Sequence, residues 1–236
     1  MSVATAHWPR HALDRRCDRG AGLSWLTPGE RETYFGFRDA SRRQAWLLGR
    51  VLAKELVLAT ALGTPLTTTQ AARLEIWSRD GLGRSLAPRV FLDGRAQPWS
   101  LSISHSDVSV LVALSCDGSA WVGVDLVPPG ALGANRLDPW LTPREREWLS
   151  TVPEGERRAG ASIVWAIKEA TYKAIGGGAR FVPRRVEACA GPANSWHARV
   201  DGRAIPGIVR VVATEREVAA VVTVAPALME TSPSST

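Results

Sequence analysis

The sequence contains few cysteines and no long apolar segment. Only Cys17, Cys116 and Cys189 occur among its 236 residues. Because they are far apart and odd in number, they indicate neither a disulfide framework nor a zinc site, and we interpret them as thiols in a reducing compartment. No stretch approaches the roughly eighteen apolar residues of a membrane-spanning helix, and the first ten residues lack the apolar core of a signal peptide. We therefore expect a cytoplasmic protein with no membrane partner.

The chain also lacks a long run of basic residues. Its net charge of +6 and pI of about 9.9 point to an anionic partner, which could be a nucleic acid, a phosphorylated cofactor or an acidic protein. The arginines are spread along the chain, so no basic tail favours nucleic-acid binding. Charge alone does not choose among these partners.

The periodicity of apolar residues predicts helices and strands in alternating groups. Helices are expected after Thr27, over 40–62, after Thr142 and over 165–174. Strands are expected over 74–78, 99–105, 108–114, 120–127, 186–190, 196–200, 208–212 and 218–224. The two strands at 108–114 and 120–127 are predicted to form a hairpin, and the residues between 78 and 99 to form a loop.

Two of these helices open on the same motif. In Thr27-Pro28-Gly29-Glu30, threonine is the expected N-cap, proline the first helical residue and glutamate the N3 residue. Leu141-Thr142-Pro143-Arg144-Glu145 repeats the pattern. We predict an α+β fold of two similar, pseudo-symmetric lobes, 1–119 and 120–228, with a disordered tail at 229–236.

The helix predicted over 165–174 carries ionisable residues on one face. At about 100° per residue, Ile167, Ala170 and Ala174 share the core side. The other side holds Trp165, Lys168, Glu169, Tyr172 and Lys173. Glu169 and Lys173 are spaced as an ordinary solvated ion pair, and this helix alone does not distinguish that interpretation from a functional site.

Asp125 interrupts the apolar strand WVGVDLV at 121–127. A buried ionised aspartate costs several kcal/mol unless it is paired or binds a cation, so Asp125 needs a partner. It could also cap the loop that follows, because Pro128 and Pro129 lie just beyond it. Asp125 and Glu169 are hard oxygen ligands of the kind that magnesium uses together with substrate phosphates.

Further candidate phosphate contacts lie upstream. The strand end SISHS at 102–106 places Ser104 beside His105, and small hydroxyls improve the prospects of a histidine as an anion ligand. Arg42, Arg43 and Arg84 are further cations, although Arg42 and Arg43 could equally form a solvated helix face, and His105 an ordinary surface residue. Together with Lys168 and Lys173, these groups predict a metal-bound diphosphate ligand and phosphoryl-centred transfer.

Three ordered motifs resemble those of the 4′-phosphopantetheinyl transferases. They are SISHS at 102–106, GVDL at 123–126 and WAIKEATYKA at 165–174. The resemblance is to the larger, two-lobed surfactin-synthetase-activating type and extends over about residues 25–224. It implies that coenzyme A donates its phosphopantetheine arm to a serine of an acidic acyl or peptidyl carrier protein, in a magnesium-dependent reaction that releases adenosine 3′,5′-bisphosphate. The implied active site lies in the cleft between the lobes of a monomer.

The resemblance also implies a role for each candidate residue. Asp125 and Glu169 match magnesium ligands, and Glu169 or a metal-associated water would take the proton of the carrier serine. Lys173, assisted by Lys168, matches a pyrophosphate contact. The coenzyme A contacts are implied to be Ser104, His105 and Arg84, with Arg42 and Arg43 near the 3′-phosphate.

The chain departs from the family at Val127, where many members have a third carboxylate. We expect a water to replace that ligand, which would weaken metal affinity but retain activity. Two other functions fit parts of the sequence. A non-catalytic protein that binds coenzyme A or acyl-coenzyme A would need the phosphate contacts but not Glu169. A nucleic-acid-binding protein would explain the pI but not Asp125.

Overall fold

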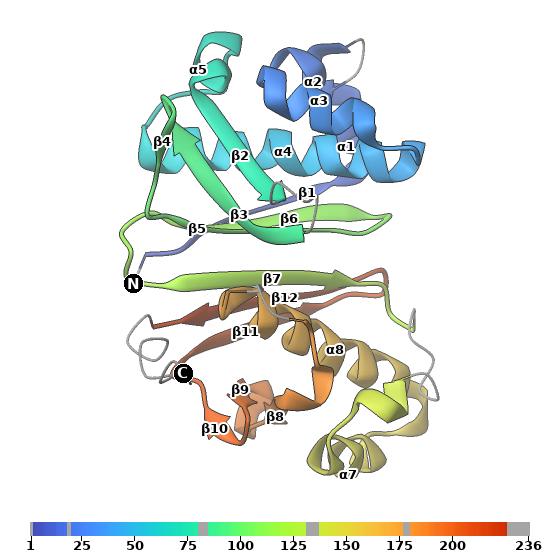
Figure 1. Cartoon of the computed structure of the whole chain (residues 1–236). Helices are drawn as coiled ribbons and strands as arrows, with labels where there is room; N and C mark the ends of the chain where they lie inside the picture. The colour runs from blue at the N-terminus through green and yellow to red at the C-terminus, as the bar shows by residue number, and fades with distance from the viewer. Residues whose placement is uncertain (1, 18–19, 80–84, 131–136, 177–179, 226–236) are drawn as a thin grey trace. The chain divides into compact units, whose positions relative to one another are not determined.

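The computed structural model describes residues 2–17, 20–79, 85–130, 137–176 and 180–225 (Figure 1). It divides into two compact units at Asp117 and Gly118, called here the N-terminal and the C-terminal unit, and each is described by itself. The predicted tail at 229–236 lies outside the described residues. Neither α4 nor any other helix in the described ranges is long and apolar enough to cross a bilayer.

The N-terminal unit packs one long helix on a small antiparallel sheet. Its elements are β1 (Ala4–Pro9), α1 (Arg10–Cys17), α2 (Ala21–Ser24), α3 (Pro28–Gly36), α4 (Ala40–Ala61), α5 (Thr68–Arg73), β2 (Leu74–Arg79), β3 (Ser85–Leu92), β4 (Arg95–Ala96), β5 (Ser100–His105) and β6 (Ser109–Ser115). Strand β6 lies between β1 and β5, and β2, β3 and β4 form a second sheet. Helix α4 packs on β6 (Figure 1), and it buries Leu48, Val51 and Leu52 in the core of the unit.

The C-terminal unit likewise packs one long helix on an antiparallel sheet. Its elements are β7 (Trp121–Val127), the 3-10 turn η2 (Asp138–Trp140), α7 (Pro143–Thr151), η3 (Glu154–Glu156), α8 (Arg157–Ala174), η4 (Pro183–Arg185), β8 (Val186–Ala190), η5 (Pro192–Asn194), β9 (Trp196–Val200), β10 (Arg203–Ala204), β11 (Gly207–Ala213) and β12 (Val218–Val224). The strand order is β10-β9-β11-β12-β7, and β8 pairs with β9. Helix α8 lies against β7 and β12 (Figure 1).

The predicted α+β class is confirmed, because antiparallel sheets are packed with helices in both units. The two predicted capped helices are α3 and α7. In each, the threonine hydroxyl accepts a hydrogen bond from the N3 glutamate's backbone N–H, and the glutamate carboxylate accepts one from the threonine's N–H. The long helix predicted over 40–62 is α4, and it begins at Ala40 with Asp39 as its N-cap.

The predicted hairpin between 108–114 and 120–127 is wrong. Strand β6 pairs with β1 and β5, whereas β7 pairs with β12. The prediction lacked β1, a strand that ends in Pro9, and therefore missed one of the two strands that pair with β6. Strand β3 was also missed and assigned to a loop, because Pro88 lies within it and proline removes a donor from the strand ladder.

The two units share the order of their elements. Strand β12 lies between β7 and β11, as β6 lies between β1 and β5. In the same way, α7 and α8 follow the order of α3 and α4, and β8-β9-β10 follows that of β2-β3-β4. The repetition reaches single turns. The β3–β4 and β9–β10 connections both read DGRA, at 93–96 and 201–204, and both place Asp and Gly at positive φ, as a type I′ hairpin turn requires.

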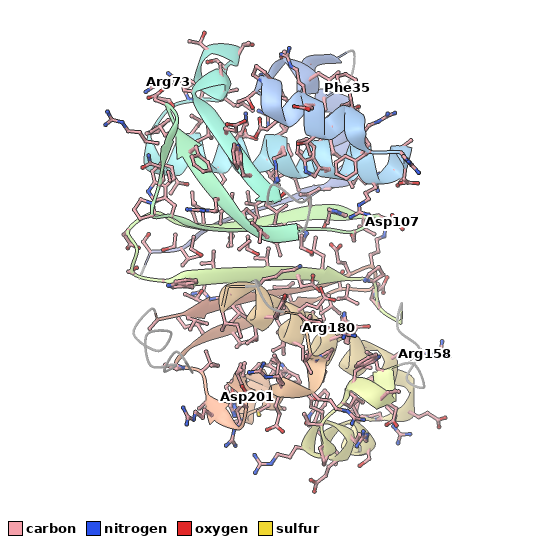
Figure 2. All side chains as sticks on the ribbon, viewed as in Figure 1. Phe35, Arg73, Asp107, Arg158, Arg180 and Asp201 are labelled. Carbon is pink, nitrogen blue, oxygen red and sulfur yellow. The ribbon has the colours of Figure 1, made fainter. Side chains whose placement is uncertain are left out.

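Each of these turns carries an ion pair on the surface of its unit. Arg73 Nη2 lies 2.7 Å from Asp93 Oδ2, and Arg185 Nη2 lies 2.5 Å from Asp201 Oδ2. Arg73 and Asp201 are labelled in Figure 2. The guanidinium partner lowers the pKa of each aspartate. Exposed pairs of this kind contribute little to stability. They are therefore a sign of the structural repeat and not a main source of each unit's stability.

The glutamate of the α3 capping box also forms a buried ion pair with a lysine of α4. Lys54 Nζ lies 2.6 Å from Glu30 Oε2, and both side chains are almost completely buried. The same carboxylate accepts the backbone N–H of Thr27 at 2.9 Å and that of Ile76 at 3.0 Å. Lys54 also donates to the backbone oxygen of Trp25 at 2.8 Å. This network ties α3, α4 and β2 together, and its charges are satisfied within the protein.

Candidate active site

The candidate site forms where α8 touches β7 at Gly123. A Cβ at this position would lie 1.8 Å from the backbone oxygen of Ala170 and 2.6 Å from the backbone nitrogen of Ala174. Only glycine therefore allows the helix backbone to approach the strand this closely. Side chains two residues apart share a strand face, so Asp125 is directed to the same side as Gly123, toward α8.

Three of the predicted residues come together at this junction. Asp125 is 5% exposed, and its Oδ1 accepts a hydrogen bond from Lys173 Nζ at 2.7 Å. Lys173 Nζ also donates to the backbone oxygen of Val124 at 3.0 Å and lies 3.9 Å from Glu169 Oε2. The structure thus places one ammonium group beside the carboxylates of Asp125 and Glu169, which come from different elements and lie 44 positions apart, from 125 to 169.

The surroundings of Glu169 resist its ionisation. Burial raises the pKa of Glu169, and the negative charge of Asp125 raises it further, whereas Lys173 and a hydrogen bond from Trp165 lower it. Two carboxylates that share a partly buried site disfavour each other's charged forms. The arrangement is therefore one that a further positive charge would stabilise.

Trp165 is a site residue to which the sequence prediction gave no role. It lies one turn before Glu169 and hydrogen-bonds to its carboxylate, and its ring meets that of Phe181 edge-on at 5.7 Å. The i, i+4 spacing of Trp165 and Glu169 on a helix is the signal that could have identified this contact. This hydrogen bond is one of the contacts that orient the Glu169 side chain.

The prediction that Lys168 lies on the polar face and assists phosphate binding is corrected by the structure. Its side chain is completely buried, and Nζ lies 2.7 Å from Glu145 Oε2. That glutamate also accepts the backbone N–H of Thr142 and that of Ala188. Lys168 donates in addition to the backbone oxygens of Trp140, Pro183 and Val186. An ammonium group with all its donors used inside the protein is not available to a ligand, so Lys168 serves the fold.

Val127 contributes no oxygen to the site. It is 5% exposed and packs in the apolar core of the C-terminal unit. Within the described ranges, no group of three or more His, Cys, Asp or Glu side chains is suited to hold a metal ion. The donor set is nevertheless of the hard-oxygen type that magnesium prefers, and the ammonium group of Lys173 already acts as a stand-in cation beside it. The residues present therefore fit a magnesium ion that keeps several water ligands.

The other predicted phosphate contacts belong to the N-terminal unit. Ser104 is buried and His105 is exposed at the end of β5. In the first turn of α4, the guanidinium of Arg42 lies 5.7 Å from the centre of the Phe37 ring, and that of Arg43 lies 5.4 Å from the Tyr34 ring. Arg84 lies outside the described residues. How these residues relate to the carboxylates of the C-terminal unit stays a prediction.

Comparison with known proteins bears on the C-terminal unit. Residues 121–224 match a family model described as "ACPS: 4′-phosphopantetheinyl transferase superfamily". The C-terminal unit resembles this superfamily. The match contains the motifs at 123–126 and 165–174, and with them Asp125, Glu169 and Lys173. The suspected resemblance to the superfamily is thereby confirmed, whereas its two-lobed subtype stays a prediction.

Two further comparisons add little. No curated protein matches the chain. A solved structure with some similarity is that of a holo-(acyl-carrier-protein) synthase from Bacillus anthracis str. Ames in complex with CoA (3′,5′-ADP). It is 24% identical, covers 48% of this chain and 91% of its own, and has a TM-score of 0.34. A TM-score this low places no residue of the present chain.

Proposed function

We propose that the chain transfers the 4′-phosphopantetheine arm of coenzyme A to a serine of an apo acyl or peptidyl carrier protein. The observation that carries this proposal is the meeting of Asp125, Glu169 and Lys173 at the junction of α8 and β7. The superfamily match over 121–224 supports it, because the matched range contains these three residues. The surfactin-synthetase-activating subtype is part of the proposal.

In this reaction the serine oxygen forms a bond to the phosphorus atom that bears the pantetheine. The bond from that phosphorus to the oxygen of the adenosine 5′-phosphate breaks, and adenosine 3′,5′-bisphosphate leaves with the electron pair. The serine proton passes to Glu169, directly or through a water. The raised pKa of Glu169 suits this role, because a base accepts a proton best when its pKa is near the working pH.

Asp125 and Glu169 would hold the magnesium ion. When bound, the ion would supply positive charge to the diphosphate oxygens and to the leaving group. Lys173 would donate a hydrogen bond to the same diphosphate, because its side chain is 30% exposed and its ammonium group lies beside both carboxylates. Trp165 keeps the Glu169 carboxylate in place. A water would take the place of the third carboxylate, which Val127 cannot supply.

Residues of the N-terminal unit are proposed as further substrate contacts. We propose Ser104, His105 and Arg84 as contacts of coenzyme A, and Arg42 and Arg43 as contacts of its 3′-phosphate. The net charge of +6 would favour docking of an acidic carrier protein. A monomeric, cytoplasmic enzyme is part of the same proposal.

The test is incubation of the full chain with coenzyme A, magnesium and each of several apo carrier proteins, followed by intact-mass measurement. The expected result is a gain of one phosphopantetheine on at least one carrier, lost when the carrier serine is changed to alanine and when magnesium is chelated. Binding of coenzyme A without a mass gain on any carrier would contradict the proposal and favour a non-catalytic coenzyme A-binding protein. Steeply salt-dependent DNA binding without coenzyme A binding would favour the nucleic-acid interpretation.

A further inference from the structure

The ammonium group of Lys173 lies among oxygen atoms of the hard type that divalent cations bind. Its Nζ lies 2.7 Å from Asp125 Oδ1, 3.0 Å from the backbone oxygen of Val124 and 3.9 Å from Glu169 Oε2. Asp125 is 5% exposed, and an ionised carboxylate buried to that extent needs a positive partner. The ammonium group of Lys173 supplies positive charge to this carboxylate.

A divalent cation and the ammonium group cannot both use Asp125 Oδ1 fully, because they repel each other and compete for the same lone pairs. Lys173 is able to withdraw. Its side chain is 30% exposed and extends from the last turn of α8. The flexible four-carbon stem of a lysine can carry the ammonium group to a new position. The chain has only two other lysines, Lys54 and Lys168. Both side chains are completely buried and donate hydrogen bonds to backbone oxygens. Lys173 alone among the lysines has room to move.

We infer that Lys173 is an internal cation that competes with a divalent metal for Asp125, and that it couples metal binding to binding of an anionic ligand. When the metal takes Asp125, the ammonium group is released as a donor for an anion. When an anion holds the ammonium group, that group no longer competes with the metal for Asp125 Oδ1. Each ligand then raises the affinity for the other by the same factor. The identity of the anion as coenzyme A rests on the proposed function; the competition at Asp125 does not.

The first test measures Mn²⁺ affinity of the full chain by titration calorimetry, without coenzyme A. Lys173→Met should bind Mn²⁺ about tenfold more tightly than the wild type, because a charge-assisted bond to Asp125 no longer competes. Lys173→Arg should restore wild-type affinity. Asp125→Asn should lose the site. The outcome that overturns the inference is a Lys173→Met variant that binds Mn²⁺ as weakly as the wild type, or more weakly, while retaining its fold by circular dichroism.

Removal of any positive charge favours cation binding slightly, so a charge-matched control is needed. Arg158 is exposed on the first turn of α8, at the opposite end of the helix from Lys173, and is labelled in Figure 2. Arg158→Met should leave Mn²⁺ affinity unchanged. If it tightens binding as much as Lys173→Met does, the effect is one of net charge and the inference is wrong.

The second test adds coenzyme A. In the wild type, saturating coenzyme A should tighten Mn²⁺ binding, and Mn²⁺ should tighten coenzyme A binding by the same factor. In Lys173→Met that factor should fall several-fold; an undiminished factor would contradict the coupling. Failure of the proposed function can be distinguished from failure of this inference, because the Mn²⁺ titration needs no transfer reaction and the carrier assay uses the wild type. If the chain transfers the arm but Lys173 does not compete with Mn²⁺, only the inference is wrong.

Discussion

The two units of this protein have the same construction but different chemistry. Both contain a capping box, a buried lysine–glutamate pair behind it and a long helix on an antiparallel sheet. Only in the C-terminal unit does the junction of helix and strand bring two carboxylates and a lysine together, among the residues that the structure describes. The shared features are those that hold a helix on a sheet. The features that differ are those that could bind a metal and phosphates.

The long helices make the difference explicit. Glu55 follows the buried Lys54 on α4, as Glu169 follows the buried Lys168 on α8. Glu55, however, lies 2.5 Å from Arg16 of α1, and the residue four positions later is alanine instead of lysine. A guanidinium group already neutralises this carboxylate within its own unit.

The first strands differ in the same way. Asp125 of β7 pairs with the third residue of β12, and His7 of β1 pairs with the third residue of β6. His7 hydrogen-bonds to Ser109 at 2.7 Å. The N-terminal unit therefore has a histidine at the position that the C-terminal unit fills with a carboxylate. Among the described residues, two carboxylates beside a lysine at the junction of helix and strand are therefore a feature of the C-terminal unit.

The largest expected effect separates the two units by activity. Glu169→Gln should lower the rate of phosphopantetheine transfer at least about a thousandfold, because it removes both a proton acceptor and a metal ligand. Glu55→Gln, the matched change on α4, should leave the rate within a few-fold of the wild type. Both rates are measured by intact mass of the carrier over time. Equal losses in the two variants would break the comparison, and a wild-type rate in Glu169→Gln would remove that residue from the mechanism.

The next effect concerns stability and should be alike in the two units. Lys54→Met and Lys168→Met each leave a buried glutamate without its cation, which should cost about 3 to 5 kcal/mol of unfolding free energy. Burial lowers the pKa of both lysines, and the glutamate partner opposes this, so each charge depends on its pair. Urea unfolding followed by circular dichroism measures the loss. A large loss in one variant with none in the other would show that the two networks are not equivalent.

The smallest effect tests the caps themselves. Thr27→Ala and Thr142→Ala each remove one side-chain acceptor at a helix N-terminus, which should cost about 1 kcal/mol. Thr27 also donates to Glu75 at 3.0 Å, a contact with no counterpart among the bonds described for Thr142. Thr27→Ala should therefore be the more destabilising of the two by thermal unfolding. The reverse order would mean that the Glu75 contact does not contribute.

The sequence predicted much of this local structure because the signals are short-range. The Thr-Pro-x-Glu caps, the apolar period of α4 and the strands of the C-terminal unit depend on residues close together in the chain. The alternative that Asp125 merely caps a loop is weakened by a local feature as well. Gly123, two residues earlier, is required for the approach of α8, so the glycine and the aspartate belong to one packing motif.

The failures came from contacts between distant segments. A helical wheel places Lys168 with the polar residues, but its ammonium group meets Glu145, 23 positions earlier (168 against 145), and three backbone oxygens. The strands 108–114 and 120–127 are neighbours in sequence, yet β6 pairs with β1, which begins at Ala4. No periodicity reports either contact, because both depend on how segments pack after they form.

Because of Gly123, the spacing of the two carboxylates and the stability of the unit depend on different parts of the structure. The approach of α8 to β7 is limited there by backbone atoms, because a Cβ at position 123 would lie 1.8 Å from the backbone oxygen of Ala170. Backbone atoms have no rotamers through which to relax, so substitutions elsewhere in the core can lower the melting temperature without changing the spacing of the two carboxylates. At position 123 the reverse holds: the smallest possible addition, one methyl group, would push helix and strand apart and thereby change the geometry on which any catalysis depends.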